Sequence, residues 1–181
     1  MQKALTYAHD AVSKALKEMV EGLRQQVGTA PLTGVIGIAN GGVPFAHRLA
    51  LEWQAQTGEK LPVGVLDVVF SRDDVGNKPI PKEVLPTQIP FDVDGATILL
   101  ADDVLFSGRT ARAALEELFQ HGRPRRVIFA VLFDRGGHQF PMRADVTGFS
   151  EKVPSEQQVK VQIAREPQAT DGIYIFTAET L

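Results

Sequence analysis

Two adjacent carboxylates, Asp102 and Asp103, follow the apolar run ILLA and precede the turn Ser-Gly-Arg-Thr at residues 107–110. Side-by-side carboxylates are costly unless a cation or a set of hydroxyl groups shares them. A turn that enters a helix presents backbone N–H groups and the positive helix end, which together bind phosphate. Gly108 lets the backbone approach a ligand, and the Ser107 and Thr110 hydroxyls can donate to phosphate oxygens. The stretch therefore predicts a site for a sugar phosphate, with the carboxylates on the sugar hydroxyls.

Two further motifs stand where a predicted strand ends. Asn-Gly-Gly at residues 40–42 follows the apolar run 35–38, and Asp-Arg-Gly-Gly at residues 134–137 follows the run 126–133. In open α/β sheets, ligands bind beyond the carboxyl ends of the strands. We therefore expect both motifs and the carboxylate pair to share one edge of a sheet.

Alternating strand and helix patterns must position these motifs. Apolar stripes predict helices and apolar runs predict strands, and the polar, proline-rich segment 71–94 predicts a functional lid. The alternation indicates an α/β fold, with a mostly parallel twisted sheet flanked by helices on both faces and a small β-rich hood toward the C-terminus. The predicted helices are 4–27, 43–56 and about 109–121, and the predicted strands are 35–38, 63–70, 97–101, 126–133, 144–148, 158–163 and 172–177.

Composition excludes several classes of protein. The 181 residues suit one domain, and with 44% hydrophobic and 23% charged residues the chain is expected to be soluble and cytoplasmic. The absence of cysteine excludes disulfides and thiolate metal sites. A net charge of −3 argues against binding nucleic acid over the whole surface. No run reaches transmembrane length or forms a signal peptide, so no membrane partner is expected.

The stretch ILLADDVLFSGRT resembles the phosphoribosyl pyrophosphate (PRPP) signature of type I phosphoribosyltransferases. The segments SRDD, GRPRRV, LFDRGG and PMRADVTG, in this order, are similar to the PyrR family of pyrimidine-operon attenuation regulators, which also have uracil phosphoribosyltransferase activity. The resemblance implies the type I phosphoribosyltransferase fold as one domain over residues 1–181. Its core would cover about 30–135, and its hood about 134–181 together with the N-terminal segment. It also suggests a homodimer or higher homo-oligomer.

The resemblance implies a role for each matching segment. Ribose hydroxyls would bind the carboxylate pair, which would also hold Mg²⁺ through water or PRPP, and the loop that opens with SRDD would close over the site. The PRPP-binding residues would be Asp102, Asp103, Val104, Leu105, Phe106, Ser107, Gly108, Arg109 and Thr110. The pyrophosphate loop would be Ala39, Asn40, Gly41 and Gly42, the flexible loop Arg72, Asp73 and Asp74, and the base or hood residues Phe133, Asp134, Arg135 and Arg143.

Three functions fit these residues. The first is the enzyme that makes UMP and pyrophosphate from uracil and PRPP with Mg²⁺, with regulation of pyrimidine genes through pyr leader RNA as a second role. The next is an RNA-binding attenuation regulator that senses nucleotide with little catalysis. The last is a purine-type phosphoribosyltransferase, for which Phe133 or Phe140 would stack on the base. No side chain stands out as a general base.

Two positions depart from the family pattern, and the basic residues are scattered. Gly41 stands where some members have a basic residue, and His138 lies one place after the histidine of the family's Gly-His-Arg. The basic cluster of residues 123–126 favours a role at a helix C-terminus. The candidates for contact with RNA phosphates are Lys14, Lys17, Arg24, Arg135, Arg143, Lys152 and Lys160.

Overall fold

The computed structural model describes residues 4–28, 31–68 and 86–177. Arg72, Asp73 and Asp74 and most of the predicted lid lie outside these ranges. The described residues form three helices, α1 (His9–Val27), α2 (Gly42–Thr57) and α3 (Arg109–Leu118), and eight strands. The strands are β1 (Ala4–Tyr7), β2 (Gly34–Ile38), β3 (Val63–Leu66), β4 (Thr97–Leu105), β5 (Arg126–Asp134), β6 (Val146–Ser150), β7 (Gln157–Gln162) and β8 (Gly172–Thr177).

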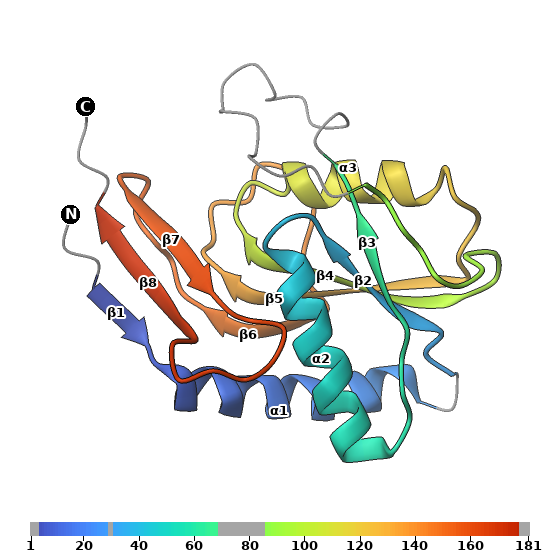
Figure 1. Ribbon diagram of the computed structural model, residues 1–181. Coiled ribbons are helices and arrows are strands. Elements are labelled where there is room, and N and C mark those ends of the chain that lie inside the picture. The colour runs from blue at the N-terminus through green and yellow to red at the C-terminus, as the bar shows by residue number, and fades with distance from the viewer. Residues whose placement is uncertain (1–3, 29–30, 69–85, 178–181) are drawn as a thin grey trace.

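A five-stranded parallel sheet forms the centre of the molecule, in the order β3-β2-β4-β5-β6. Helices α1 and α2 cover one face and α3 covers the other (Figure 1). Successive residues of β4 serve the two faces, since Leu99 packs with the α1 and α2 side and Leu100 with the α3 side. Burial on both faces explains why the central strands are continuous apolar runs. The predicted α/β fold class is confirmed.

A second, antiparallel sheet in the order β1-β8-β7 lies beside the first and forms the β-rich hood (Figure 1). The predicted helix at 4–27 is wrong for its first turn, because residues 4–7 pair with β8 and the helix begins at His9. From there Val12, Leu16 and Leu23 form a buried stripe. Strand pairing satisfies the backbone of residues 4–7, so a distant partner decides their conformation.

Strand β6 belongs to the main sheet, although it lies in the segment expected to form the hood. It pairs in parallel with β5, with Ala130 opposite Val146 and Phe133 opposite Phe149. Within the described residues the hood sheet therefore consists of β1, β7 and β8. The division of one domain into a core and a hood, with the boundaries given above, stays a prediction. Among the described residues, no helix combines the length and the apolar character needed to cross a membrane.

Candidate functional site

The carboxylate pair lies within β4, not after it. The strand was predicted to end at Ala101, but it continues to Leu105 because β5 continues beside it, with Asp102 opposite Val131 and Leu105 opposite Asp134. The prediction missed this extension because charged residues are rare in a buried strand. Both aspartates therefore lie within the central strand, near its carboxyl end.

Local hydrogen bonds hold the two carboxylates in place. The Asp103 N–H donates to Oδ1 of Asp102 at 3.0 Å, and the Val104 N–H donates to Oδ1 of Asp103 at 2.9 Å. Asp102 is buried. Burial raises the pKa of the Asp103 carboxyl, and its hydrogen bonds with Asp102 and Val104 act in the opposite direction. Burial thus makes ionisation of Asp103 costly, while its local hydrogen bonds favour the ionised form.

The glycine loop of residues 39–42 lies directly against this pair. Helix α2 begins at Gly42, and a side chain added there would overlap the carbonyl oxygen of Ala101. Gly37 in β2 permits the same close approach, since an added Cβ would lie 2.6 Å from the Val43 Cα. The peptide between Ala39 and Asn40 is cis. The structure therefore brings the predicted pyrophosphate loop and the predicted ribose carboxylates into contact.

The turn of residues 107–110 leads from β4 into α3. Gly108 has φ of 88°, a left-handed conformation that favours glycine. The Ser107 hydroxyl accepts a weak hydrogen bond from the Arg109 N–H at 3.4 Å. The first turn of α3 contains no acidic residue, so its N–H groups face no built-in carboxylate from that turn. This arrangement suits a phosphate group.

The segment after β5 is attached to the phosphate turn by its backbone. The N–H groups of Gln139 and Phe140 both donate to the Ser107 carbonyl at 3.0 Å, and the Arg135 N–H donates to the Leu105 carbonyl at 3.0 Å. The Arg109 guanidinium lies 5.0 Å from the centroid of the Phe140 ring. The predicted base segment and phosphate turn thus form one wall of the site.

The four predicted base residues differ in how they are placed. Phe133 is fully buried and packs near Tyr7 and Phe149, with centroid distances of 6.2 Å and 6.5 Å. Arg135 is buried as well, and burial lowers the pKa of its guanidinium. Its Nη2 donates to the carbonyls of Pro154 and Gln157 at 3.0 Å, so this side chain joins β5 to the hood.

The other two base candidates lie closer to solvent. Asp134 Oδ1 accepts from the Gly136 N–H at 2.9 Å and lies 2.8 Å from His138 Nε2. Arg143 is exposed and lines a small cavity of about 200 Å³ between α3 and β5. Asp145, two residues further along, accepts the Phe129 N–H at 2.8 Å. The roles of all predicted site residues remain predictions.

Sequence reasoning missed two features of this wall. The His138 ring is held by Asp134, which the spacing of four residues could have suggested. Phe106 is 41% exposed beside the phosphate turn, and the Arg135 guanidinium lies 4.2 Å from its ring centroid. An arginine over an aromatic ring is stabilising, but no local pattern indicates it, because Phe106 follows β4 and Arg135 follows β5.

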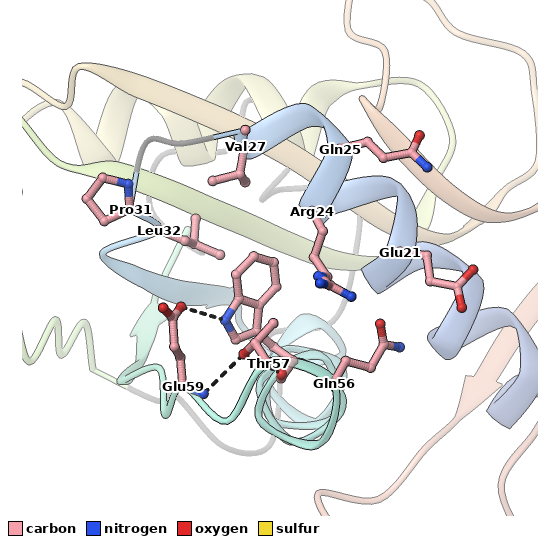
Figure 2. Close-up of a pocket in the computed structure, with 11 residues that line it drawn as sticks. Glu21, Arg24, Gln25, Val27, Pro31, Leu32, Gln56, Thr57 and Glu59 are labelled. Carbon is pink, nitrogen blue, oxygen red and sulfur yellow. Dashed lines mark hydrogen bonds between the residues drawn. The ribbon is translucent and has the colours of Figure 1, made fainter.

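A cavity of about 870 Å³ lies at the opposite edge of the sheet, between the C-terminal ends of α1 and α2 (Figure 2). Trp53 is one of the residues that line it, and its indole N–H donates to Glu59 at 3.4 Å. Of the predicted residues only Arg24, an RNA candidate, lines it. Because ligands of parallel sheets bind at the carboxyl edge, the contacts described above are the better candidate for chemistry.

The basic candidates are spread over several elements. On α1, Lys14 lies 3.7 Å from Glu18 in an exposed ion pair. Arg126 donates to the Gln26 carbonyl at 2.9 Å, in the last turn of α1. The helix-terminus role expected for the cluster 123–126 is therefore seen for Arg126, on a helix distant in sequence.

Comparisons with known proteins show the family and the fold of this chain. The phosphoribosyl transferase domain family matches residues 5–165. The "Bifunctional protein PyrR" of Thermus aquaticus is 40% identical over 169 residues, which cover 93% of this chain and 91% of that protein. The protein of the same name from Deinococcus radiodurans is 37% identical over 182 residues, which cover 99% and 97%. The hypoxanthine phosphoribosyltransferase of Trypanosoma cruzi has a similar fold, with a TM-score of 0.69 at 13% identity over 97% of each chain.

Proposed function

The chain belongs to the phosphoribosyl transferase domain family and, within it, to the PyrR family, and from this premise we propose that it transfers the ribose 5-phosphate of PRPP to uracil. The products are UMP and pyrophosphate. One observation carries the proposal: the carboxylate pair, the glycine loop and the phosphate turn lie together at the carboxyl ends of β4 and β2. That juxtaposition provides adjacent places for a ribose, a pyrophosphate and a 5-phosphate.

The reaction replaces pyrophosphate by a uracil nitrogen at the anomeric carbon, through a state with oxocarbenium character. The N–H groups of the turn 107–110 and of α3 hold the 5-phosphate, which fixes the sugar in place. Asp102 and Asp103 orient the ribose hydroxyls. The backbone of loop 39–42 meets the departing pyrophosphate and stabilises its negative charge.

The carboxylate pair also fits Mg²⁺. Hard cations prefer carboxylate oxygens, and Mg²⁺ is often bound by one or two carboxylates together with substrate phosphates and water. Among the described residues, no group of three or more His, Cys, Asp or Glu side chains could hold a metal ion. Asp102 and Asp103 would therefore hold the ion only together with water and PRPP. When bound, Mg²⁺ neutralises the charge of pyrophosphate.

A second role in regulation is supported by the name "bifunctional" that the relatives carry. In this role the chain, as a homodimer or higher oligomer in the cytoplasm, binds pyr leader RNA, and UMP in the site controls that affinity. Lys14, Lys17 and Arg24 on α1 supply part of the basic surface. Gel-shift titration of pyr leader RNA with and without UMP tests it. A nucleotide-dependent shift supports regulation, and its absence contradicts it.

The catalytic proposal is tested by incubating the protein with PRPP, Mg²⁺ and one base at a time. We expect uracil to yield UMP, and hypoxanthine and guanine to yield little product. IMP or GMP formation in place of UMP would establish the purine alternative. Failure to form UMP together with UMP-dependent RNA binding would identify a regulator with little catalysis.

A further inference from the structure

The pyrophosphate loop is supported by the Asp103 carboxyl group. The three heavy atoms nearest to a Cβ added at Gly41 all belong to that group, namely Oδ2, Cγ and, at 2.6 Å, Oδ1. Real Cβ atoms are not found this close to other heavy atoms, so a side chain at residue 41 and this carboxylate exclude each other. One of the two must move if both are present.

Backbone conformation does not explain why residue 41 is glycine. Gly41 has φ of −68° and ψ of −34°, in the right-handed helical region that every residue can adopt. Gly108 is different, since its φ of 88° by itself favours glycine. The requirement for glycine at residue 41 is therefore steric, and its origin is the Asp103 side chain.

The Asp103 carboxylate has little freedom to move away. Its Oδ1 accepts the Val104 N–H at 2.9 Å, while its own backbone N–H is bound to Oδ1 of Asp102. The strand beneath it pairs with β5 through the neighbouring residues Asp102 and Val104, whereas its pairing with β2 ends at Ala101. On the other side, Gly42 lies so close to β4 that an added Cβ would be 3.1 Å from the Asp102 Cα. Loop and carboxylate are thus packed directly against each other, with no room for a side chain between them.

We propose that Asp103 is the positioning residue of the pyrophosphate loop, and that Gly41 is glycine so that the loop can rest on this carboxylate and meet pyrophosphate with backbone groups alone. This inference rests on the proposed function, since it assigns the loop 39–42 to pyrophosphate. The two aspartates then have different roles, because Asp103 faces the loop with one carboxylate oxygen and its own strand with the other. Binding of ribose and of pyrophosphate then becomes energetically coupled through Asp103.

A double-mutant cycle tests the contact. The proteins are the unmodified chain, Gly41→Ala, Asp103→Ala and the combined variant, with Asp103→Ser in place of Asp103→Ala if the latter does not fold. Calorimetric titration with pyrophosphate and with PRPP gives affinities, and thermal melting gives stability without ligand. Gly22→Ala is the matched glycine control, because nothing lies within 4 Å of its added Cβ.

In the unmodified background, we expect Gly41→Ala to weaken pyrophosphate binding about tenfold or more and to lower the melting midpoint by about 4 °C or more. In the Asp103→Ala background the space is open, so the same change should alter affinity by less than about twofold. Asp103→Asn keeps the shape of the side chain, so Gly41→Ala should remain harmful beside it. Gly22→Ala should leave pyrophosphate affinity unchanged.

Equal effects of Gly41→Ala in the unmodified and Asp103→Ala backgrounds would overturn the proposal, as would a harmless Gly41→Ala. The affinity and melting measurements need no uracil or other nucleobase, so they are separate from the proposed reaction. A protein that binds PRPP with the expected coupling but makes no UMP keeps this inference and loses the uracil assignment. A protein that makes UMP but shows additive effects loses only this inference. An unmodified protein that binds no pyrophosphate overturns both.

Discussion

The carboxyl edge of the main sheet and the seam where helix α2 meets the loop before β8 are held together in opposite ways. At the edge, glycines let backbones touch, and adjacent carboxylates lie where burial raises the pKa of Asp103. At the seam, the buried guanidinium of Arg48 on α2 pairs with the buried carboxylate of Asp171, just before β8. Asp171 also accepts the N–H groups of Ala164 at 3.0 Å and Gln168 at 3.2 Å.

The difference between the two regions lies in how the cost of burying a carboxylate is offset. Asp171 is fully compensated by a cation and by backbone donors, so its charge serves stability. The pair at residues 102 and 103 accepts local backbone N–H groups, and in the proposed function it also binds the ribose hydroxyls. Sites that bind ligands commonly carry such a cost, and other parts of the structure offset it. Changes at the edge should therefore alter activity more than stability, and changes at the seam should do the reverse.

The largest effect is expected from replacing both edge carboxylates. Asp102→Asn with Asp103→Asn should lower turnover by about 10³-fold or more, because the ribose and the metal lose their charged acceptors. The melting midpoint should stay the same or rise, since a repulsive pair is removed. Steady-state rates and calorimetric melting measure the two quantities. Asp10→Asn, at an exposed carboxylate in α1, is the control and should keep turnover. Retained turnover in the double variant would mean that the ribose site is elsewhere.

At the seam, Arg48→Met should lower the free energy of unfolding by about 3 kcal/mol, because it leaves the Asp171 carboxylate buried without its cation. The rate per folded molecule should change little, since Arg48 lies outside the proposed site. Denaturant unfolding and initial rates test this directly. A stable variant with lost activity would reverse the contrast between the two regions.

A substitution at Gly108 tests the carboxyl edge of the main sheet without changing a charge. Gly108→Ala places a Cβ in a left-handed conformation and 3.0 Å from the Met142 Cβ. The turn should distort, and the KM for PRPP should rise about tenfold, through loss of about 1.4 kcal/mol of phosphate binding. The KM for uracil should be unchanged. A rise confined to uracil would assign this turn to the base.

Acid should weaken the seam in a defined pH range. Burial alone would raise the pKa of Asp171, but Arg48 and the two N–H donors outweigh it and hold the pKa below its ordinary value. A folded pKa below the unfolded value of about 3.9 means that the stabilisation is complete above that pH and is lost as the pH falls through the folded pKa. Unfolding free energies between pH 6 and pH 3 should therefore fall more steeply for the unmodified protein than for Asp171→Asn. Parallel curves would contradict the assignment.

The smallest effect is expected away from both regions. Gly22 lies within α1, where glycine is less favourable than alanine, and an added Cβ meets nothing within 4 Å. Gly22→Ala should raise the free energy of unfolding by about 0.5–1 kcal/mol. Activity should not change. A loss of stability would indicate a contact of this face that the isolated chain does not show.

Local patterns predicted much of the fold and of the edge. Apolar runs located the central strands, because both faces of a parallel sheet are buried. The glycines and carboxylates that follow these runs located the strand-end motifs, because the residues of each motif are neighbours in the sequence. The predictions failed where the partner is distant. Residues 4–7 form a strand only because β8 lies beside them, and β4 extends past Ala101 only because β5 does.

The seam was not predictable for the same reason. Arg48 and Asp171 are separated by 123 positions, and neither stands in a motif. Arg135 likewise belongs to a predicted base segment but donates to carbonyls of the hood. The reason for Gly41 also needed coordinates, because a glycine in an ordinary helical conformation gives no local sign of its neighbour.

The uracil-dependent release of pyrophosphate from PRPP in the presence of Mg²⁺ is the decisive measurement for the proposed reaction. We expect pyrophosphate and UMP in equal amounts when uracil is added. We expect no release when uracil is omitted or when the Asp102→Asn, Asp103→Asn protein is used. Pyrophosphate release that does not depend on uracil, or equal release by the double variant, would contradict the proposed function.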